Sequence, residues 1–312
     1  MRDIPHIPVL LDEVLLVFAD LEPGQFVDCT LGYGGHSEAI LKNFPEVTLV
    51  GIDQDAEAIA FSTKRLAPFG ERFSTLKGRY SERIAEIDFS KTTGILADIG
   101  VSSLQLDKQE RGFSFSSETL DMRMDQGREF SAYNVVNEYS QQELEKIFLE
   151  YGEERAFRKI AKLIVDERKK VPITSSAQLA SLIEKHHHCP GIHPATRVFQ
   201  AIRIEVNDEL GELERFFDVL EKNGKKGMIV AVITFHSLED RIVKNRFKEW
   251  SKSCICPPEA FRCECGNNNE LGKAVNKKPL TASKQELKTN PRSRSAKLRA
   301  FMFTKDGNGR EI

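Results

Sequence analysis

The chain has 312 residues, of which 40% are hydrophobic and 29% charged, and its formal net charge is -2 at pH 7. This is the composition of an ordinary soluble protein with room for one large domain or two modest ones. Six cysteines are too few for a disulfide scaffold, and Asp12 and Glu13 interrupt the only apolar run near the N-terminus. We therefore expect a cytoplasmic protein without a membrane span.

The first hundred residues alternate between strand and helix patterns. A helix is expected over 10–18, and a strand over 26–31 then leads into a glycine loop and a helix that Ser37 could cap. Further strands are expected at 47–53, 73–76 and 94–100, with a helix over 55–66. This alternation predicts an α/β fold, a doubly wound and mostly parallel Rossmann-like sheet, with ligands at the carboxyl ends of the strands.

Four features fall at those predicted strand ends: the loop from Gly32 to His36, then Asp53, Tyr80 and Asp98. Asp53 lies about twenty residues beyond the glycines, a spacing that suits an acid reaching the ribose hydroxyls of a nucleotide-like cofactor. Each feature also has a local explanation, because glycines form turns, aspartates cap helices and tyrosines pack. Their coincidence at one sheet edge favours a cofactor site.

From residue 107 the strand pattern disappears. Helical spacing over 141–148, 153–165 and 176–187 predicts an inserted helical domain, so we divide the chain into 1–106, 107–205 and 206–312, the outer two parts forming one domain. Arg197 and Arg203 in the insert could grip a phosphate backbone, although a charged face on a solvated helix is the commoner explanation.

The last third of the chain returns to the sheet pattern. A helix is expected over 207–220 and a strand over 227–235, followed by a helix that Ser237 could cap and a final strand at 298–303. His236 opens the segment FHSLEDR and could line the target side of a site or simply hold the strand end.

The C-terminal region is locally basic. From Arg241 to Lys305 there are 16 Lys and Arg against 5 Asp and Glu, which suits a phosphate-rich partner or a solvated tail. Four cysteines crowd the same region, in two Cys-x-Cys pairs: Cys254, Cys256, Cys263 and Cys265. They could bind zinc through four thiolates, or the loop could be a flexible basic RNA contact. Cys189 is interpreted as structural.

Two cofactor classes need a glycine loop and an acid at the second strand. A dinucleotide-binding dehydrogenase calls for Gly or Ala where this chain has Ser37. Asp28 followed by Gly32 and Gly34 better matches methyltransferases that use S-adenosylmethionine. An NAD-dependent oxidoreductase and a non-catalytic cofactor-binding RNA protein remain the alternatives.

Eight segments together resemble one family, the bacterial ribosomal RNA small-subunit methyltransferase H family: DCTLGYGGHS, GIDQDAEAI, DIGVSSLQLD, RGFSFSSETLDMRMD, YGEERAFRKIA, HPATRVFQAIRI, FHSLEDRIVK and NPRSRSAKLR. The resemblance covers nearly the whole chain. It implies a Rossmann-like class I methyltransferase with an inserted helical domain that methylates N4 of a cytidine at the decoding centre of 16S rRNA, within the small ribosomal subunit.

The resemblance also implies site residues. It assigns contacts with S-adenosylmethionine to Gly34, Gly35, His36, Asp53, Tyr80, Asp98 and Gln105. The family usually has Ser-Ser-Pro-Gln where this chain has Ser-Ser-Leu-Gln at 102–105, so the loop lacks a fixed φ before Gln105. We further hypothesise that Asp98 is catalytic and lies near the transferring methyl, and that Ser102, Ser103 and His236 line the target side.

Overall fold

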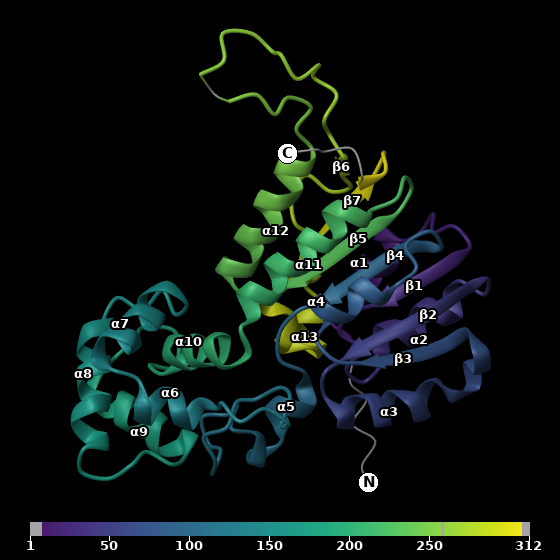
Figure 1. Cartoon of the computed structure of the whole chain (residues 1–312). Coiled ribbons are helices and arrows are strands. Elements are labelled where there is room, and N and C mark those ends of the chain that lie inside the picture. Colours follow the sequence, from purple (N-terminus) through teal and green to yellow (C-terminus); the bar gives the residue numbers. More distant parts are fainter. Residues whose placement is uncertain (1–7, 258, 308–312) are drawn as a thin grey trace. The chain divides into compact units, whose positions relative to one another are not determined.

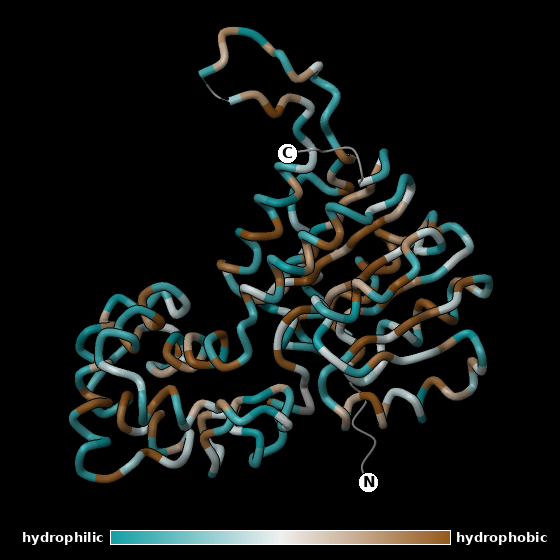
Figure 2. Tube along the Cα trace, viewed as in Figure 1, coloured by the Kyte–Doolittle hydropathy of each residue, from teal (hydrophilic) through white to brown (hydrophobic). Residues whose placement is uncertain are grey.

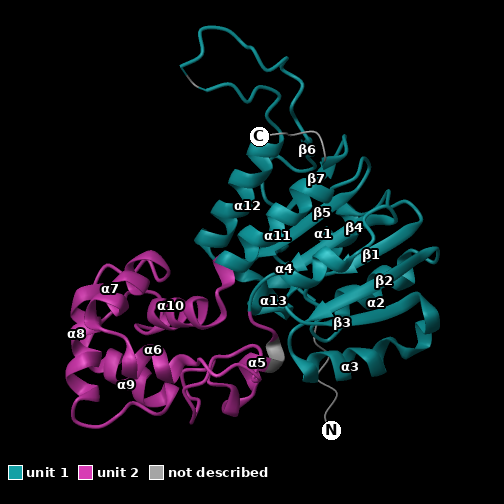
Figure 3. Ribbon diagram, in the orientation of Figure 1, with its two compact units in different colours: residues 1–100, 211–312 teal, residues 101–210 magenta. Residues whose placement is uncertain are grey.

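The computed structural model describes residues 8–257 and 259–307, except for the side chains of Ser103 and Leu104. The chain forms two compact units (Figure 3): unit 1 comprises 1–100 and 211–312, and unit 2 comprises 101–210. Unit 2 extends a few residues beyond the predicted insert at each end. At its C-terminal end Arg203 forms an ion pair with Glu209, with 2.8 Å between Nε and Oε1.

Unit 1 is built on a seven-stranded sheet in the order β3-β2-β1-β4-β5-β7-β6 (Figure 1). The strands are β1 Gly24–Asp28, β2 Val47–Asp53, β3 Phe73–Lys77, β4 Thr92–Asp98, β5 Ile229–Thr234, β6 Gly272–Ala274 and β7 Lys297–Phe303. The first five pair in parallel, whereas β7 pairs antiparallel with both β5 and β6. The predicted doubly wound, mostly parallel sheet is confirmed.

Helices cover both faces of this sheet. Its α-helices are α1 Leu11–Val17, α2 Gly35–Asn43, α3 Ala56–Leu66, α4 Tyr80–Arg83, α11 Glu209–Asn223, α12 Ser237–Trp250 and α13 Glu286–Thr289, and its short 3-10 turns are η1 Ala67–Arg72, η2 Ile84–Glu86 and η4 Pro291–Ser295. One core packs α11 and α12 against the sheet, and a second packs α1, α2 and α3. The strands between them are the most continuously apolar part of the trace (Figure 2), as expected for strands buried on both faces.

Three local predictions are wrong in detail. Ser37 does not cap α2, because the helix begins at Gly35 and Gly34 is its N-cap. Ser237 does not cap α12 either, since His236 occupies that position and forms a capping box with Glu239. The first strand ends at Asp28 rather than at residue 31, because the chain then turns into the glycine loop.

Unit 2 is all-helical, and no strand occurs among residues 101–210. Its helices are α5 Ser103–Asp107, η3 Gln109–Arg111, α6 Ala132–Glu138, α7 Gln141–Glu150, α8 Phe157–Arg168, α9 Ser176–His186 and α10 Thr196–Asn207. They share a single hydrophobic core. The helix predicted from Glu153 starts only at Phe157, because Glu153 has a positive φ of 48°.

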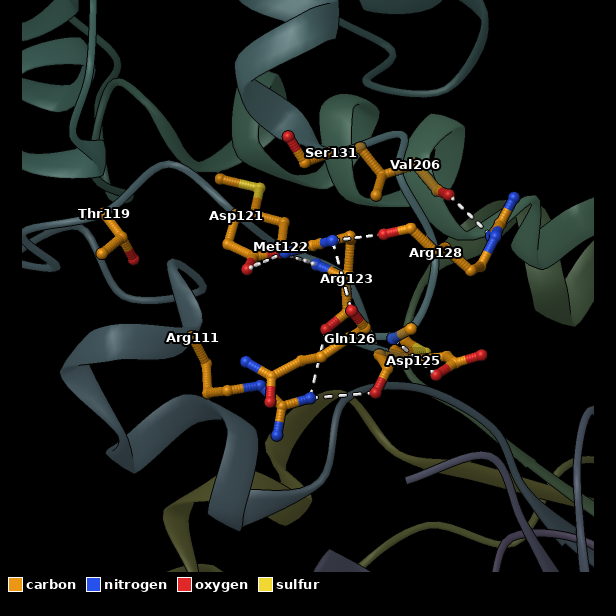
Figure 4. A network of polar contacts seen from close by, with 12 residues as sticks. Arg111, Thr119, Asp121, Met122, Arg123, Asp125, Gln126, Arg128, Ser131 and Val206 are labelled. Carbon is orange, nitrogen blue, oxygen red and sulfur yellow. Dashed lines mark hydrogen bonds and ion pairs between the residues drawn. The ribbon is translucent and has the colours of Figure 1, made fainter. Parts of the chain in front are cut away.

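A buried arginine organises the loop between η3 and α6 (Figure 4). Arg111 donates from Nη2 to the carbonyl oxygens of Arg123 at 3.1 Å and Met124 at 2.9 Å. Arg128 donates from Nη1 to the carbonyl of Val206 at 3.0 Å and so connects the loop to α10. This loop carries most of the RGFSFSSETLDMRMD segment, whose first arginine therefore has a structural role.

Among the described residues, no helix combines the length and apolarity that crossing a membrane requires.

Candidate functional site

The strand order reverses between β1 and β4, and in a doubly wound sheet this is where ligands bind, beyond the carboxyl ends of the strands. The predicted residues of unit 1 lie along that edge. Asp28, Asp53 and Asp98 are the last residues of β1, β2 and β4, and Tyr80 opens α4 shortly after β3 ends. The glycine loop follows β1. The structure thus gathers these residues at one sheet edge.

The glycine loop depends on backbone conformations and spaces that side chains do not tolerate. Gly32 and Gly34 have positive φ values of 49° and 71°. At Gly35, a Cβ atom would lie only 2.5 Å from Cγ of Pro8. Pro8 therefore fills the side-chain position of Gly35, whereas a Cβ at Gly32 would meet only the Thr30 carbonyl oxygen, at 3.8 Å. The main chain at Gly32 is thus open to close approach by a ligand, next to the N-terminal N–H groups of α2.

Asp28 holds the glycine loop through two hydrogen bonds. Its Oδ1 accepts from the backbone N–H of Thr30 at 3.2 Å, and its Oδ2 accepts from the Ser37 hydroxyl at 2.6 Å. Burial raises the pKa of Asp28 to about 6, although both hydrogen bonds oppose the shift. Asp28 therefore has a structural role in holding the loop, and Ser37 is its side-chain hydrogen-bond donor.

Asp53 joins the end of β2 to the same loop. Its Oδ2 accepts from the backbone N–H of Gly32, and its Oδ1 accepts from that of Asp55, both at 2.8 Å. Burial raises the pKa of Asp53 to about 6. Each carboxylate oxygen has a further lone pair, so Asp53 can hold the loop and still accept from a ribose hydroxyl.

His36 and Asp98 face each other across the switch point. Burial lowers the pKa of His36 to about 4, so its ring is neutral at pH 7. Its Nε2 lies 2.9 Å from the carbonyl oxygen of Val9 and must donate to it, which leaves Nδ1 unprotonated, 3.8 Å from Oδ2 of Asp98. The ring therefore presents a lone pair, and no positive charge, to Asp98.

Asp98 is the most perturbed acid of this edge. Burial, with Asp28 and Glu239 as nearby acids, raises the pKa of Asp98 to about 8. Its Oδ1 is buried and has no hydrogen-bond partner among the described residues. A buried acceptor without a donor is costly in the absence of a ligand, so this oxygen is the clearest place for an N–H or O–H group of a bound molecule.

Tyr80 and His236 are both held by neighbours within unit 1. The Tyr80 ring packs edge-on against Phe216, with 5.4 Å between ring centroids. The His236 ring is buried at the N-terminus of α12, where Nε2 lies 3.0 Å from Oε1 of Glu239. The helix cap accounts for the position of His236 without a ligand.

The remaining candidates belong to unit 2. Gln105 and Ser102 bond to each other, since Oε1 of Gln105 accepts from the Ser102 N–H at 3.0 Å. Arg203 is occupied by its two hydrogen bonds to Glu209, at 2.8 and 2.9 Å. The Arg197 side chain is 38% exposed, with Nη1 4.0 Å from Oε2 of Glu154. The Ser103 side chain lies outside the described residues.

The sequence did not predict how three hydroxyl residues support the site: Thr30 and Ser62 were not singled out, and Ser37 was expected only as a helix cap. The Thr30 hydroxyl oxygen accepts from the backbone N–H of Asp98 at 2.7 Å and so joins the ends of β1 and β4. Ser62 donates to the carbonyl of Gly32, and Ser37 donates to Asp28. Thr30 and Ser37 lie within DCTLGYGGHS, so their place in that motif was the available signal, whereas nothing local marks Ser62.

These features favour a cationic ligand over a dinucleotide. Asp28 is buried, and Asp53 and Asp98 are partly buried. When these three acids are ionised beside a neutral histidine, they suit a positive group such as a sulfonium or an ammonium. The antiparallel β7 between β5 and β6 also departs from the 3-2-1-4-5-6 order of the dinucleotide-binding fold. Fold and site together define a class I methyltransferase.

Comparisons with known proteins identify the family. The MraW methylase family matches residues 3–304, so the chain belongs to this family. Relatives named ribosomal RNA small subunit methyltransferase H include those of Wolinella succinogenes, 60% identical over 96% of this chain and 98% of the relative, and Nautilia profundicola, 57% identical over 97% and 98%. That of Sulfurimonas denitrificans is 54% identical over 98% of this chain and its own whole length. The chain is thus a methyltransferase, and S-adenosylmethionine is its methyl donor.

Proposed function

We propose that this enzyme methylates the exocyclic N4 of a cytidine in the 16S rRNA of the small ribosomal subunit, at the decoding centre, in the cytoplasm. The observation that carries the proposal is identity of 54–60% over nearly the entire chain with proteins named ribosomal RNA small subunit methyltransferase H. The NAD-dependent oxidoreductase and the non-catalytic RNA-binding protein are not supported by this family.

The residues at the sheet edge fit the donor. We assign contacts with S-adenosylmethionine in unit 1 to Gly34, Gly35, His36, Asp53, Tyr80 and Asp98, and in unit 2 to Gln105. The open main chain at Gly32 accommodates close approach of the amino-acid part, and the second lone pairs of Asp53 suit the ribose. Bound S-adenosylmethionine would supply a methyl group on a sulfonium, so that a bond from the amine nitrogen to the methyl carbon could form while the carbon–sulfur bond breaks and the neutral thioether leaves.

Asp98 is the residue we propose to act at the target. Its unpartnered Oδ1 can accept an N–H of the target amine and so orient the nitrogen lone pair toward the methyl group. The raised pKa means that Asp98 is largely protonated at neutral pH without ligand, so a bound cation must first favour its ionised form; the carboxylate is then a better proton acceptor than an ordinary aspartate. Most of the rate should come from positioning, because the donor is already activated.

The inserted unit is proposed to recognise RNA. Arg197 is the better placed of the two predicted arginines, because its guanidinium is partly exposed, whereas Arg203 is held by Glu209. Ser102, Ser103 and His236 remain proposals for the target side, and the target base must leave its stack to reach the methyl group.

One labelling experiment tests the function. The purified enzyme is incubated with labelled S-adenosylmethionine and either small ribosomal subunits lacking the modification or naked 16S rRNA, and the RNA is digested to nucleosides. We expect label in N4-methylcytidine. Label in another nucleoside, or none in either RNA together with binding of NAD, would refute the proposal.

Matched variants test the role of Asp98. Asp98→Asn keeps the shape of the side chain and should abolish transfer, whereas Asp88→Asn changes an acid bonded to Ser90 in an exposed turn and should leave it unchanged. Donor binding is measured in parallel by calorimetry. Near-normal transfer by Asp98→Asn with unaltered donor affinity would remove Asp98 from the reaction.

A further inference from the structure

A long loop between α12 and β6, residues 251–271, extends beyond the ends of both elements (Figure 1). It contains four of the six cysteines, in two Cys-x-Cys pairs separated by six residues: Cys254, Cys256, Cys263 and Cys265. Neither the donor site nor the proposed RNA chemistry uses them.

The four sulfur atoms converge on one point. Sγ of Cys254 lies 3.7 Å from that of Cys263 and 3.8 Å from that of Cys265, and the Cys263 and Cys265 sulfurs are 3.5 Å apart. All four lie within 4.8 Å of one another. A tetrahedral zinc site with Zn–S bonds of about 2.3 Å requires sulfur atoms about 3.8 Å apart. The cluster thus already has the dimensions of a tetrathiolate site.

Backbone N–H groups point at the sulfurs from the opposite arm of the loop. Ile255, inside the first Cys-x-Cys pair, donates to Sγ of Cys265 at 3.4 Å. Glu264, inside the second pair, donates to Sγ of Cys256 at 3.2 Å. Each pair therefore supplies a donor to a sulfur of the other, an arrangement that stabilises the negative charge of metal-bound thiolates.

The loop has no apolar core to hold this arrangement. None of its described residues before Leu271, namely 251–257 and 259–270, is buried, and Phe261 is fully exposed. The base of the loop is closed by polar contacts, in which Asn269 donates from Nδ2 to the carbonyls of Ser253 at 3.2 Å and Cys265 at 3.0 Å. A segment with so little buried apolar surface needs a cross-link to hold one conformation.

We propose that Cys254, Cys256, Cys263 and Cys265 bind one structural Zn²⁺ ion. Soft thiolates in tetrahedral geometry select zinc over hard cations such as Mg²⁺. Four protein ligands leave no open coordination position, so the ion stabilises the loop and takes no part in methyl transfer. The metal closes the loop that connects α12 to β6 and thereby fixes the basic C-terminal segment at its start.

Metal content tests the site directly. The full-length protein is purified under reducing conditions without chelator, and zinc and iron are quantified by mass spectrometry. We expect about one zinc per chain. Cys256→Ser and Cys265→Ser should lose nearly all of it, while Cys189→Ser, the matched change at a cysteine of unit 2, should retain it. Iron in place of zinc, substoichiometric metal, or full zinc content in Cys256→Ser would overturn the proposal.

Two further measurements do not depend on catalysis. Co²⁺ titrated into the zinc-free protein should give the intense visible absorption of a tetrahedral tetrathiolate site, absent in Cys265→Ser. Removal of zinc should also accelerate tryptic cleavage after Arg262, in the exposed middle of the loop, while circular dichroism stays unchanged. Cleavage at the same rate with and without zinc, or four cysteines found as two disulfides by alkylation and mass analysis, would refute the metal site.

Discussion

The raised pKa of Asp98 makes folding stability depend on pH in a way that one substitution can reveal. Burial raises this pKa from 3.8 to about 8, so between those values the folded protein retains a proton that the unfolded chain has lost. The free energy of unfolding therefore falls as the pH rises from about 4 to about 8 and changes no further above that. Asp98→Asn cannot ionise and escapes this loss.

The size of the effect follows from the shift. Four pKa units correspond to an upper bound on the order of 5 kcal/mol. The side chain is 23% exposed, and solvent screens its charge, so we expect about 2 kcal/mol at pH 9. For a protein of 312 residues, that is a rise in Tm of about 3 °C.

The assay is differential scanning calorimetry of both proteins without ligand at several pH values from 5 to 9. The Tm of Asp98→Asn minus that of the unsubstituted protein should be small at pH 5, grow through neutrality and level off above pH 8. Asp88→Asn is the control, because hydrogen bonds with Ser90 and Lys91 lower the pKa of Asp88 and its substitution should bring no gain at high pH. A difference that stays constant from pH 5 to pH 9 would refute the reasoning.

Three further substitutions test the supports of the fold and site. Ser37→Ala removes the donor to the buried Asp28 carboxyl group and should cost about 1–3 kcal/mol, measured by urea unfolding, and weaken donor binding. Gly35→Ala places a Cβ against Pro8 and should abolish donor binding, measured by calorimetry. Arg111→Lys shortens the side chain by one bond, so its nitrogen falls short of the two carbonyls to which Nη2 donates. Unit 2 should lose about 2 kcal/mol of stability, measured by hydrogen exchange in that unit.

Each of these three substitutions has a control variant or an outcome that would contradict it. Ser90→Ala removes an exposed hydroxyl and should change the unfolding free energy little; an equal loss in both serine variants would contradict the role of Ser37. Gly32→Ala meets no atom closer than 3.8 Å and should cost only the roughly 1 kcal/mol of a left-handed backbone, so equal damage by both glycine variants would argue against a steric limit at Gly35. Unchanged exchange in Arg111→Lys would show that the two hydrogen bonds donated by Nη2 are dispensable.

The sequence by itself determined the elements that carry the site. The apolar runs over 47–53 and 94–100 predicted two parallel strands, the second of which ends at Asp98 in the structure, and the glycines after Asp28 predicted the turn that follows β1. These predictions succeed because short buried strands and glycine turns are encoded by adjacent residues. The helical insert was recognised for the same reason, since the apolar residues of each helix repeat with helical spacing.

Only the tertiary structure decided which hydrogen bonds and packing contacts join these elements. The partners of Ser37, Thr30 and Ser62 lie in other elements or in the loop, so a helix cap was the nearest local interpretation of Ser37 and was wrong. The space beside Gly35 is filled by Pro8, which precedes it by 27 residues in the sequence and meets it only in the folded chain. The apolar pattern of β7 likewise does not reveal that this strand lies antiparallel between β5 and β6.

The charge state of the site was also decided by the tertiary structure. No local pattern gives the pKa of about 8 at Asp98 or the neutral ring of His36, because both result from burial by elements that meet only after folding. The sequence determined which groups stand at the sheet edge, since those groups follow directly on their strands. Folding decided their protonation and their partners, because desolvation and hydrogen bonding act between residues that are distant in the chain.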